Sequence, residues 1–182
     1  MEFLKNRRNA KLMTAVVIVL CFFLGTGRSL RREIGKVEAL FYSGVEGRVS
    51  ISTQLAKKVN ESHNLLSVAD DYNSVLGSLP DNLRAAGEAV TSAATPAEKY
   101  EADETLTEAA SDLTEALLQC DLTAQQRDVV DEANQNMENI DKAIAKSGYN
   151  DAVDEFNNTV LRAFPASVMK GITGAGEAEA FR

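Results

Sequence analysis

A 16-residue stretch without a charged side chain, Leu12–Gly27, limits the structures available to this chain more than any other feature. As an α-helix it is about 24 Å long, slightly shorter than the hydrocarbon core of a bilayer, which is roughly 30 Å thick. Lys11 and Arg28 flank the stretch, and their long side chains can reach the headgroup regions. The pattern predicts a transmembrane anchor at residues 12–28, after a basic segment at residues 1–11.

The same stretch also fits a secretory signal peptide, because basic residues precede an apolar run of similar length. Small residues at Gly25 and Gly27 provide a cleavage site, and cleavage near Gly27 would release a soluble chain. We expect an uncleaved anchor. Four basic residues precede the stretch and three follow it closely, which slightly favours a cytoplasmic N-terminus. The rest of the chain would then lie outside the cytoplasm, in a single-pass protein of the cell membrane.

Charge is divided unevenly along the chain. Residues 1–36 carry eight Lys or Arg and two acids, whereas residues 37–182 carry eleven Lys or Arg and twenty-five acids. The two net charges, +6 and −14, give the whole-chain value of −8. Because an acidic domain repels phosphate groups, we expect no nucleic-acid partner. The basic residues on both sides of the apolar run are placed to meet lipid headgroups.

A helical period and few helix breakers predict an all-α domain. Apolar side chains recur every three or four residues from Val49 to Leu79, and Pro80 is expected to end that helix. Asp81 is expected to cap a short helix after it. Thr95 and Thr123 each begin a capping-box sequence, T-P-A-E and T-A-Q-Q, so a longer helix is expected after each.

The last predicted helix, in the sequence YNDAVDEFNNTVLRAFP at residues 149–165, carries an aromatic–asparagine pair twice, seven residues apart. The aromatic residues fall on one stripe and the asparagines on the stripe beside it. We expect the aromatics to fill the seam between helices and the asparagines to fix helix register through buried hydrogen bonds. Alternatively, the asparagines line a groove for a partner.

Long helices joined by short loops predict the arrangement of the whole domain. They favour an antiparallel four-helix bundle at residues 29–168. The tail at residues 169–182 is rich in Gly, Ala and Glu and is expected to be flexible, although its Phe181 can dock on the bundle.

Residue types suited to catalysis are sparse. The single histidine, His63, makes a zinc site built on histidines or a Ser-His-Asp triad very hard to assemble. Cys120 is expected to be a buried apolar filler. Glu101, Glu104 and Glu108 crowd one predicted helix, but a di-iron site of the bundle type also needs Glu-x-x-His pairs. We therefore expect a solvated acidic face and predict no catalytic, metal-binding or cofactor-binding residue.

The C-terminal run Y-N-x-A-V-x-x-[FY]-N-x-x-[VIL]-x-x-F-P resembles the closing signature of the LemA family. The chain carries it at Tyr149, Asn150, Ala152, Val153, Phe156, Asn157, Val160, Phe164 and Pro165. A further aromatic–asparagine pair followed by proline, with similar spacing, occurs at Tyr72, Asn73 and Pro80. The segment containing Lys57, Lys58, Asn64, Leu65 and Leu66 is similar to the family's Q-L-x-R-R-x-x-L-x-x-N-L-[VL] segment.

The resemblance implies a membrane-anchored helical bundle in a family without established enzymatic activity. Some members of the family are encoded beside membrane peptidases or other envelope proteins, which implies a protein partner of that kind. We therefore expect a non-enzymatic interaction or scaffold module at the cell envelope. Two alternatives stay open: a metal-binding or enzymatic bundle that uses the acidic helix Glu101–Glu108, and a secreted soluble bundle after cleavage near Gly27.

Overall fold

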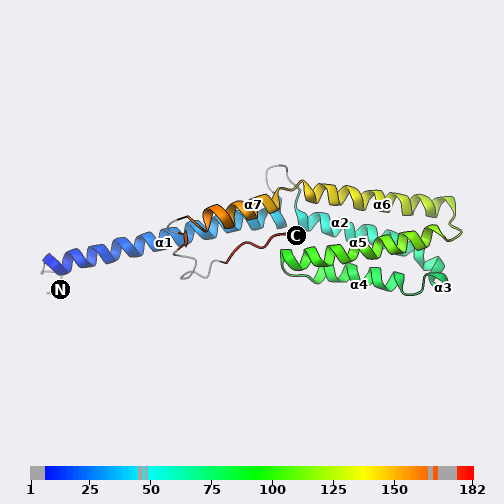
Figure 1. Ribbon diagram of the computed structural model, residues 1–182, viewed down its shortest axis with the longest axis horizontal. Helices are drawn as coiled ribbons and strands as arrows, with labels where there is room; N and C mark the ends of the chain where they lie inside the picture. The colour runs from blue at the N-terminus through cyan, green and yellow to red at the C-terminus, as the bar shows by residue number, and fades with distance from the viewer. Residues whose placement is uncertain (1–6, 45–46, 48, 164–165, 168–175) are drawn as a thin grey trace. The chain divides into compact units, whose positions relative to one another are not determined.

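Helices make up most of the chain in this computed structural model (Figure 1). It describes residues 7–44, 47, 49–163, 166–167 and 176–182. These ranges contain no β-strand, so the all-α prediction is confirmed.

The chain divides into two compact units. Unit 1 contains Met1–Val37 and Ala152–Ala178, and unit 2 contains Glu38–Asp151 and Glu179–Arg182. The sequence instead predicted one bundle domain at residues 29–168. That boundary stays a prediction, and each unit is described separately below.

Helix α1 spans Arg7–Tyr42 without interruption, and its 36 residues make a helix about 54 Å long. The portion Met13–Tyr42 is, within the described ranges, the helix long and apolar enough to cross a membrane. Its apolar part is almost entirely exposed, since only 6% of the most apolar window is buried. The large exposed apolar residues there are Met13, Val16, Val17, Ile18, Val19, Leu20, Phe22 and Leu24. This exposure fits a single-pass membrane protein.

Four longer helices form most of unit 2: α2 (Ile51–Ala69), α4 (Leu79–Ser92), α5 (Pro96–Leu118) and α6 (Ala124–Ala145). Helix α2 contacts each of the other three, and α4 lies along α5 (Figure 1). Their apolar stripes meet in a core whose fully buried members include Leu55, Leu65, Leu83, Leu106, Leu113, Leu117 and Val130. Burial of these stripes, rather than intrinsic helix propensity, supplies most of the stability of such helices.

The helix predicted to run from Val49 to Leu79 is shorter than expected. Helix α2 ends at Ala69, and a 3₁₀ turn η2 (Asp70–Tyr72) and a short helix α3 (Asn73–Leu76) follow it. Gly77 then adopts a φ of 59°, a left-handed value that favours glycine. The apolar period continued through this region and concealed the break.

Pro80 does not end a helix, which corrects the prediction made from the sequence. It lies in the first turn of α4, where its missing N–H removes no intrahelical hydrogen bond. Asp81 is not the cap of this helix either, because Ser78 occupies the N-cap position. Asp81 instead forms a 2.6 Å ion pair with Arg84 in the same turn.

Both predicted capping boxes are confirmed. Thr95 Oγ1 accepts a hydrogen bond from the backbone N–H of Glu98, and Glu98 Oε2 accepts one from the Thr95 N–H. The backbone hydrogen bonds from Ala94 and Thr95 lower the pKa of the Glu98 carboxyl below its ordinary value. Thr123 and Gln126 make the same reciprocal pair at the start of α6.

Replacing Thr95 with alanine is expected to destabilise unit 2 by about 1 kcal/mol, the usual cost of removing an N-cap side chain. Chemical denaturation of the full chain in detergent micelles measures this change. The matched control is Thr105→Ala, since Thr105 is an exposed threonine in the middle of α5. The control is expected to change stability by less than about 0.5 kcal/mol. Equal effects of the two substitutions would contradict a capping role.

The predicted C-terminal helix is regular only at its start. Helix α7 covers Tyr149–Glu155, and a π-helical turn η3 follows at Phe156–Val160. Phe164 and Pro165, the end of the family signature, lie outside the described residues.

The described end of the tail, Gly176–Arg182, is not helical. The sequence predicted a flexible tail whose Phe181 can dock, and Phe181 is indeed only 6% exposed. The contacts of this residue are part of the candidate site.

Candidate functional site

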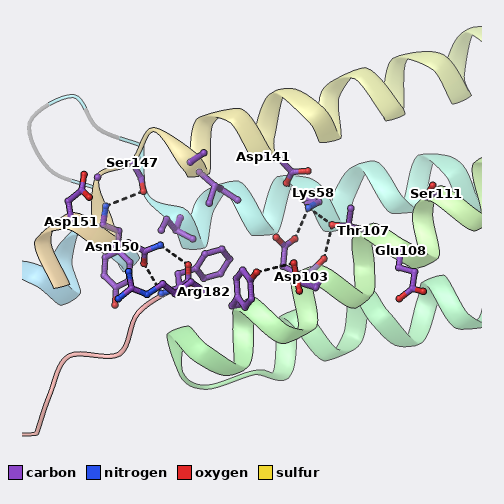
Figure 2. A pocket seen from close by; sticks show the side chains of 18 of the residues that line it. Lys58, Asp103, Thr107, Glu108, Ser111, Asp141, Ser147, Asn150, Asp151 and Arg182 are labelled. Carbon is purple, nitrogen blue, oxygen red and sulfur yellow. Dashed lines mark hydrogen bonds and ion pairs between the residues drawn. The ribbon is translucent and has the colours of Figure 1, made fainter. Parts of the chain in front are cut away.

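Unit 2 contains an open cleft of about 830 Å³ between α2, α5, α6 and the last residues of the tail (Figure 2). Six carboxylates line it: Asp103, Glu104, Glu108, Asp112, Asp141 and Asp151. Two cationic side chains, Lys58 and Arg182, also line it. The cleft is therefore acidic, in line with the negative charge of residues 37–182.

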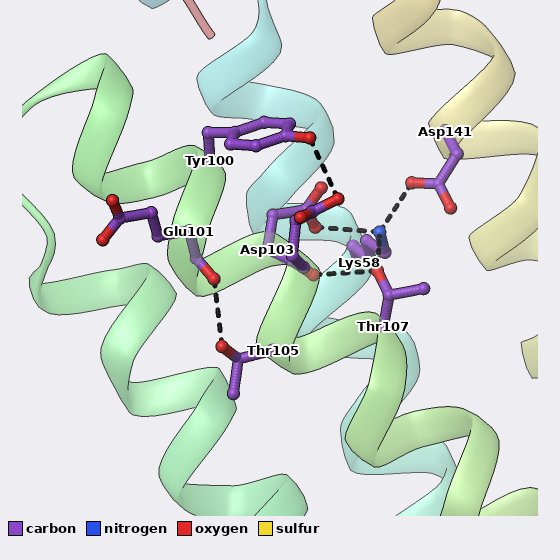
Figure 3. A network of polar contacts seen from close by, with 8 residues as sticks. Lys58, Tyr100, Glu101, Asp103, Thr105, Thr107 and Asp141 are labelled. Carbon is purple, nitrogen blue, oxygen red and sulfur yellow. Dashed lines mark hydrogen bonds and ion pairs between the residues drawn. The ribbon is translucent and has the colours of Figure 1, made fainter. Parts of the chain in front are cut away.

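A buried lysine lines the cleft and contacts polar groups of α5 and α6 (Figure 3). The side chain of Lys58, on α2, is only 1% exposed. Its Nζ lies 2.8 Å from Asp103 Oδ1 and 2.6 Å from Asp141 Oδ1, and it donates a 2.7 Å hydrogen bond to Thr107 Oγ1. Two of these contacts, to Thr107 and Asp141, are hydrogen bonds, and the contact with Asp103 is an ion pair. Lys58 thus joins α2 to both α5 and α6.

The sequence positions of Lys58 and Asp103 explain their burial. Lys58 lies on the apolar stripe of α2 with Leu55 and Ser62, and Asp103 lies on the stripe of α5 with Leu106. Opposite charges at core positions of two helices were therefore a visible signal of a buried ion pair. From the sequence, Lys58 was singled out only as part of a family segment, and this pair was not predicted.

The surroundings of the Asp103 carboxyl disfavour its charged form. Burial raises its pKa above the ordinary 3.8, although the nearby Lys58 ammonium opposes this shift. The contact of Oδ1 with Lys58 is short but lacks hydrogen-bond direction, so this buried oxygen accepts no hydrogen bond from the described residues. The charges of Asp141 and Glu104 raise the pKa further.

The raised pKa of Asp103 predicts a specific dependence of stability on pH. The folded state holds this proton more tightly than the unfolded chain, so the stabilising contribution is complete below the ordinary pKa. It is lost as the pH rises through the folded-state pKa. Relative to Asp103→Asn, which does not titrate, the wild type is expected to lose stability between the ordinary pKa and neutral pH. Urea titrations of both proteins across this range measure the difference, and a difference that grows in favour of the wild type would contradict the prediction.

The tail residue Phe181 enters an aromatic cluster at one end of the cleft. Its ring lies 5.9 Å from that of Phe41 and 5.3 Å from that of Tyr100, measured between centroids. The Tyr100 contact is edge-to-face, at 87°, a favourable geometry for aromatic pairs. The ring of Tyr149 also packs against that of Phe41, with ring centroids 5.2 Å apart. Phe41 itself is completely buried.

Asn150 and Tyr149 hold the backbone of the same tail residues. Asn150 Nδ2 donates a 2.8 Å hydrogen bond to the carbonyl of Phe181, and Asn150 Oδ1 accepts a 2.9 Å bond from its N–H. The hydroxyl of Tyr149 donates a 2.6 Å bond to the carbonyl of Glu179. Burial, with the neighbouring Tyr42 and Glu179, raises the pKa of Tyr149 to about 12, so this hydroxyl keeps its proton at neutral pH.

Asn157 makes the equivalent pair of bonds within unit 1. Its Nδ2 donates to the carbonyl of Ala178 and its Oδ1 accepts from the N–H of the same residue, both at 2.8 Å. The repeated asparagines of the signature therefore bind peptide groups of the tail. Buried hydrogen bonding was the expected use of these side chains, but the tail rather than a neighbouring helix is the partner seen here.

The other predicted signature residues within the described ranges are either buried or hydrogen-bonded to backbone carbonyls. Tyr149 and Phe156 are each only 2% exposed, as expected for seam residues. The hydroxyl of Tyr72 donates to the carbonyl of Asp121 at 2.9 Å. Asn73 is exposed and binds only the carbonyl of the nearby Asp70, so the earlier aromatic–asparagine pair does not hold the tail. Pro80 is buried in the first turn of α4.

Other residues considered for chemistry lie apart from the cleft. His63 and Cys120 are not among its lining residues. Contrary to expectation, Cys120 is not fully buried. No group of three His, Cys, Asp or Glu side chains within the described ranges is arranged to hold a metal ion. Of the acidic helix, Glu104 and Glu108 line the cleft and Glu101 does not.

A family comparison covers the part of the chain that contains this site. The model of the LemA family matches residues 48–182, which include α2 to α7 and the tail. A comparison with curated proteins gives no significant match. The family match covers well over half of the 182 residues and includes the signature from which the resemblance was inferred. The chain belongs to the LemA family.

Proposed function

We propose that the protein is a non-enzymatic, membrane-anchored helical module that binds a partner protein at the cell envelope. In this proposal α2, α4, α5 and α6 form an antiparallel four-helix bundle. Helix α1 holds the bundle at the membrane, on the side away from the cytoplasm. The anchor raises the effective concentration of the module toward an envelope protein, such as a membrane peptidase.

The exposed apolar surface of α1 is the observation that carries the proposal. Large side chains such as Ile18 and Leu24, which are 63% and 71% exposed, follow one another along this helix. Soluble proteins rarely expose continuous apolar patches of this size, and a bilayer is the natural environment for them.

The chemistry of the cleft favours binding over catalysis. Lys58 is buried and in contact with two carboxylates and a hydroxyl, so its Nζ is engaged by groups of the protein and has little access to a substrate. The other end of the cleft already holds a peptide segment, the tail, through Asn150 and the aromatic cluster.

Single-cysteine variants test the anchor and its orientation. Cys21 and Cys120 are replaced by serine, and Glu115→Cys or Asn6→Cys is added. A membrane-impermeant maleimide applied to intact cells with an accessible outer surface is expected to label the Glu115→Cys chain and not the Asn6→Cys chain. Both chains are expected to stay in the membrane after alkaline extraction. Reversed labelling would place unit 2 in the cytoplasm, and an intact mass lacking the residues up to Gly27 would support the secreted alternative.

The partner and metal alternatives have separate tests. Crosslinking in cells is expected to join the protein to another envelope protein, and recovery of lipid alone would contradict an interaction role. Calorimetry with divalent metal ions is expected to show no stoichiometric binding. Tight binding that is lost on Glu104→Gln and Glu108→Gln substitution would instead favour the metal-binding alternative.

A further inference from the structure

We propose that the acidic cleft of unit 2 is a binding site for an extended peptide that carries an aromatic residue followed by basic residues. The protein's own tail occupies one end of this site and acts as an internal competitor. The inference rests on the proposed interaction role and names the chemistry of the partner segment. A segment of another protein is the occupant we assign.

The tail defines how a peptide is held. Asn150 donates to the backbone C=O and accepts from the backbone N–H of one residue, Phe181, and a side-chain amide used in this way recognises a backbone whatever its side chains. Tyr149 binds the carbonyl two residues earlier. Sequence preference comes from the single buried side chain, Phe181, which lies between Phe41 and Tyr100. These contacts select an aromatic residue in an otherwise unspecified extended segment.

The open part of the cleft decides which residues a bound peptide can carry after its aromatic one. With the tail in place about 830 Å³ of the cleft is still open. Figure 2 shows Asn150 and Arg182 at one end and Glu108 and Ser111 at the other, with Lys58 between them. A longer peptide held as the tail is held can therefore extend from the position of Arg182 toward Glu108.

The charge of the open part favours basic side chains. Glu104, Glu108 and Asp112 are exposed on successive turns of α5 and face the cleft. Lys58 does not offset them, because its charge is balanced by Asp103 and Asp141. A segment that continues past the position of Arg182 with lysine or arginine would place cations beside these carboxylates.

Peptide binding to the full chain in detergent micelles tests this proposal. The protein carries Phe181→Ala, which empties the aromatic cluster. The probe is a fluorescent peptide with the sequence of residues 176–182 followed by two lysines and an amidated end, and anisotropy gives its Kd. We expect saturable binding that is about tenfold tighter than for the same peptide ending in two glutamates, and an advantage that disappears at high salt. The unmodified chain is expected to bind at least about tenfold more weakly, because its tail competes.

Two variants separate this site from nonspecific attraction. Asn150→Ala in the Phe181→Ala background is expected to abolish binding, whereas replacement of Asn158, an exposed asparagine of η3, by alanine is expected to leave it unchanged. Replacing the probe's phenylalanine with alanine is also expected to abolish binding. Equal binding of the lysine and glutamate peptides, or binding that survives Asn150→Ala, would overturn the proposal.

Hydrogen exchange of the unmodified chain keeps the proposal testable if Phe181→Ala unfolds the protein. The N–H of Phe181 is bonded to Asn150 and is expected to exchange slowly. Addition of the lysine peptide at about millimolar concentration, comparable to the effective concentration of a tethered segment, is expected to displace the tail and accelerate this exchange. Unchanged exchange would overturn the proposal. Neither experiment depends on membrane topology, so its failure is distinguishable from a failure of the anchor.

Discussion

Replacement of Lys58 by methionine is expected to destabilise unit 2 by about 3–5 kcal/mol, the range seen when one partner of a buried ion pair is removed. The two carboxylates would respond differently. Asp103 has a side chain only 12% exposed and would lose its nearby cation, whereas the Asp141 side chain is 43% exposed and would be solvated by water. The cost therefore arises mainly at Asp103. Chemical denaturation of the full chain in micelles at neutral pH measures it.

The neighbouring lysine provides a matched control. Lys57 lies beside Lys58 on α2 but is exposed, and Lys57→Met is expected to change stability by less than about 0.5 kcal/mol. A double variant, Lys58→Met with Asp103→Leu, removes both buried charges and is expected to recover much of the lost stability. A small effect of Lys58→Met alone would mean that water already reaches the pair.

Replacement of Phe156 by alanine is expected to cost about 3–5 kcal/mol in unit 1, because the substitution leaves a large cavity where an aromatic ring was buried. Phe156 is 2% exposed and begins the π-helical turn η3. Denaturation measured by near-ultraviolet circular dichroism and by proteolysis of unit 1 reports this loss.

The control for this substitution lies in the same turn. Asn158 is exposed, so Asn158→Ala tests whether any change in η3 is disruptive and is expected to have an effect below about 0.5 kcal/mol. If Phe156→Ala cost less than about 1 kcal/mol, Phe156 would be a surface residue and not part of a core.

Local features of this chain were predictable from sequence because neighbouring residues determine them. The capping box of Thr95 and Glu98 needs only four consecutive residues, and it forms as expected. Pro80 shows the limit of this reasoning, since a proline suits both the end of one helix and the first turn of the next. The break after Ala69 has no strong local signal because the apolar period continues through it.

The candidate site was less predictable because its parts are far apart in sequence. Asn150 and Phe181 are 31 positions apart. The sequence of the tail around Phe181 has no helical or strand period that indicates where it docks. The Lys58–Asp103 pair left a partial signal, a charge on each of two apolar stripes. Pairing those two charges requires knowledge of which helices are adjacent, and periodicity alone does not provide it.

The spacing of the two asparagines in α7 and η3 corresponds to the spacing of the tail residues that they bind. Seven residues of helix advance about 10 Å, and three residues of extended chain also advance about 10 Å. Asn150 and Asn157 are separated by the first interval, and their partners Phe181 and Ala178 by the second. Seven helical residues and three extended residues therefore cover about the same distance. The spacing of the two asparagines along the chain thus matches that of the two tail residues whose backbone groups they bind, and these bonds place no demand on the side chains of Glu179 and Ala180.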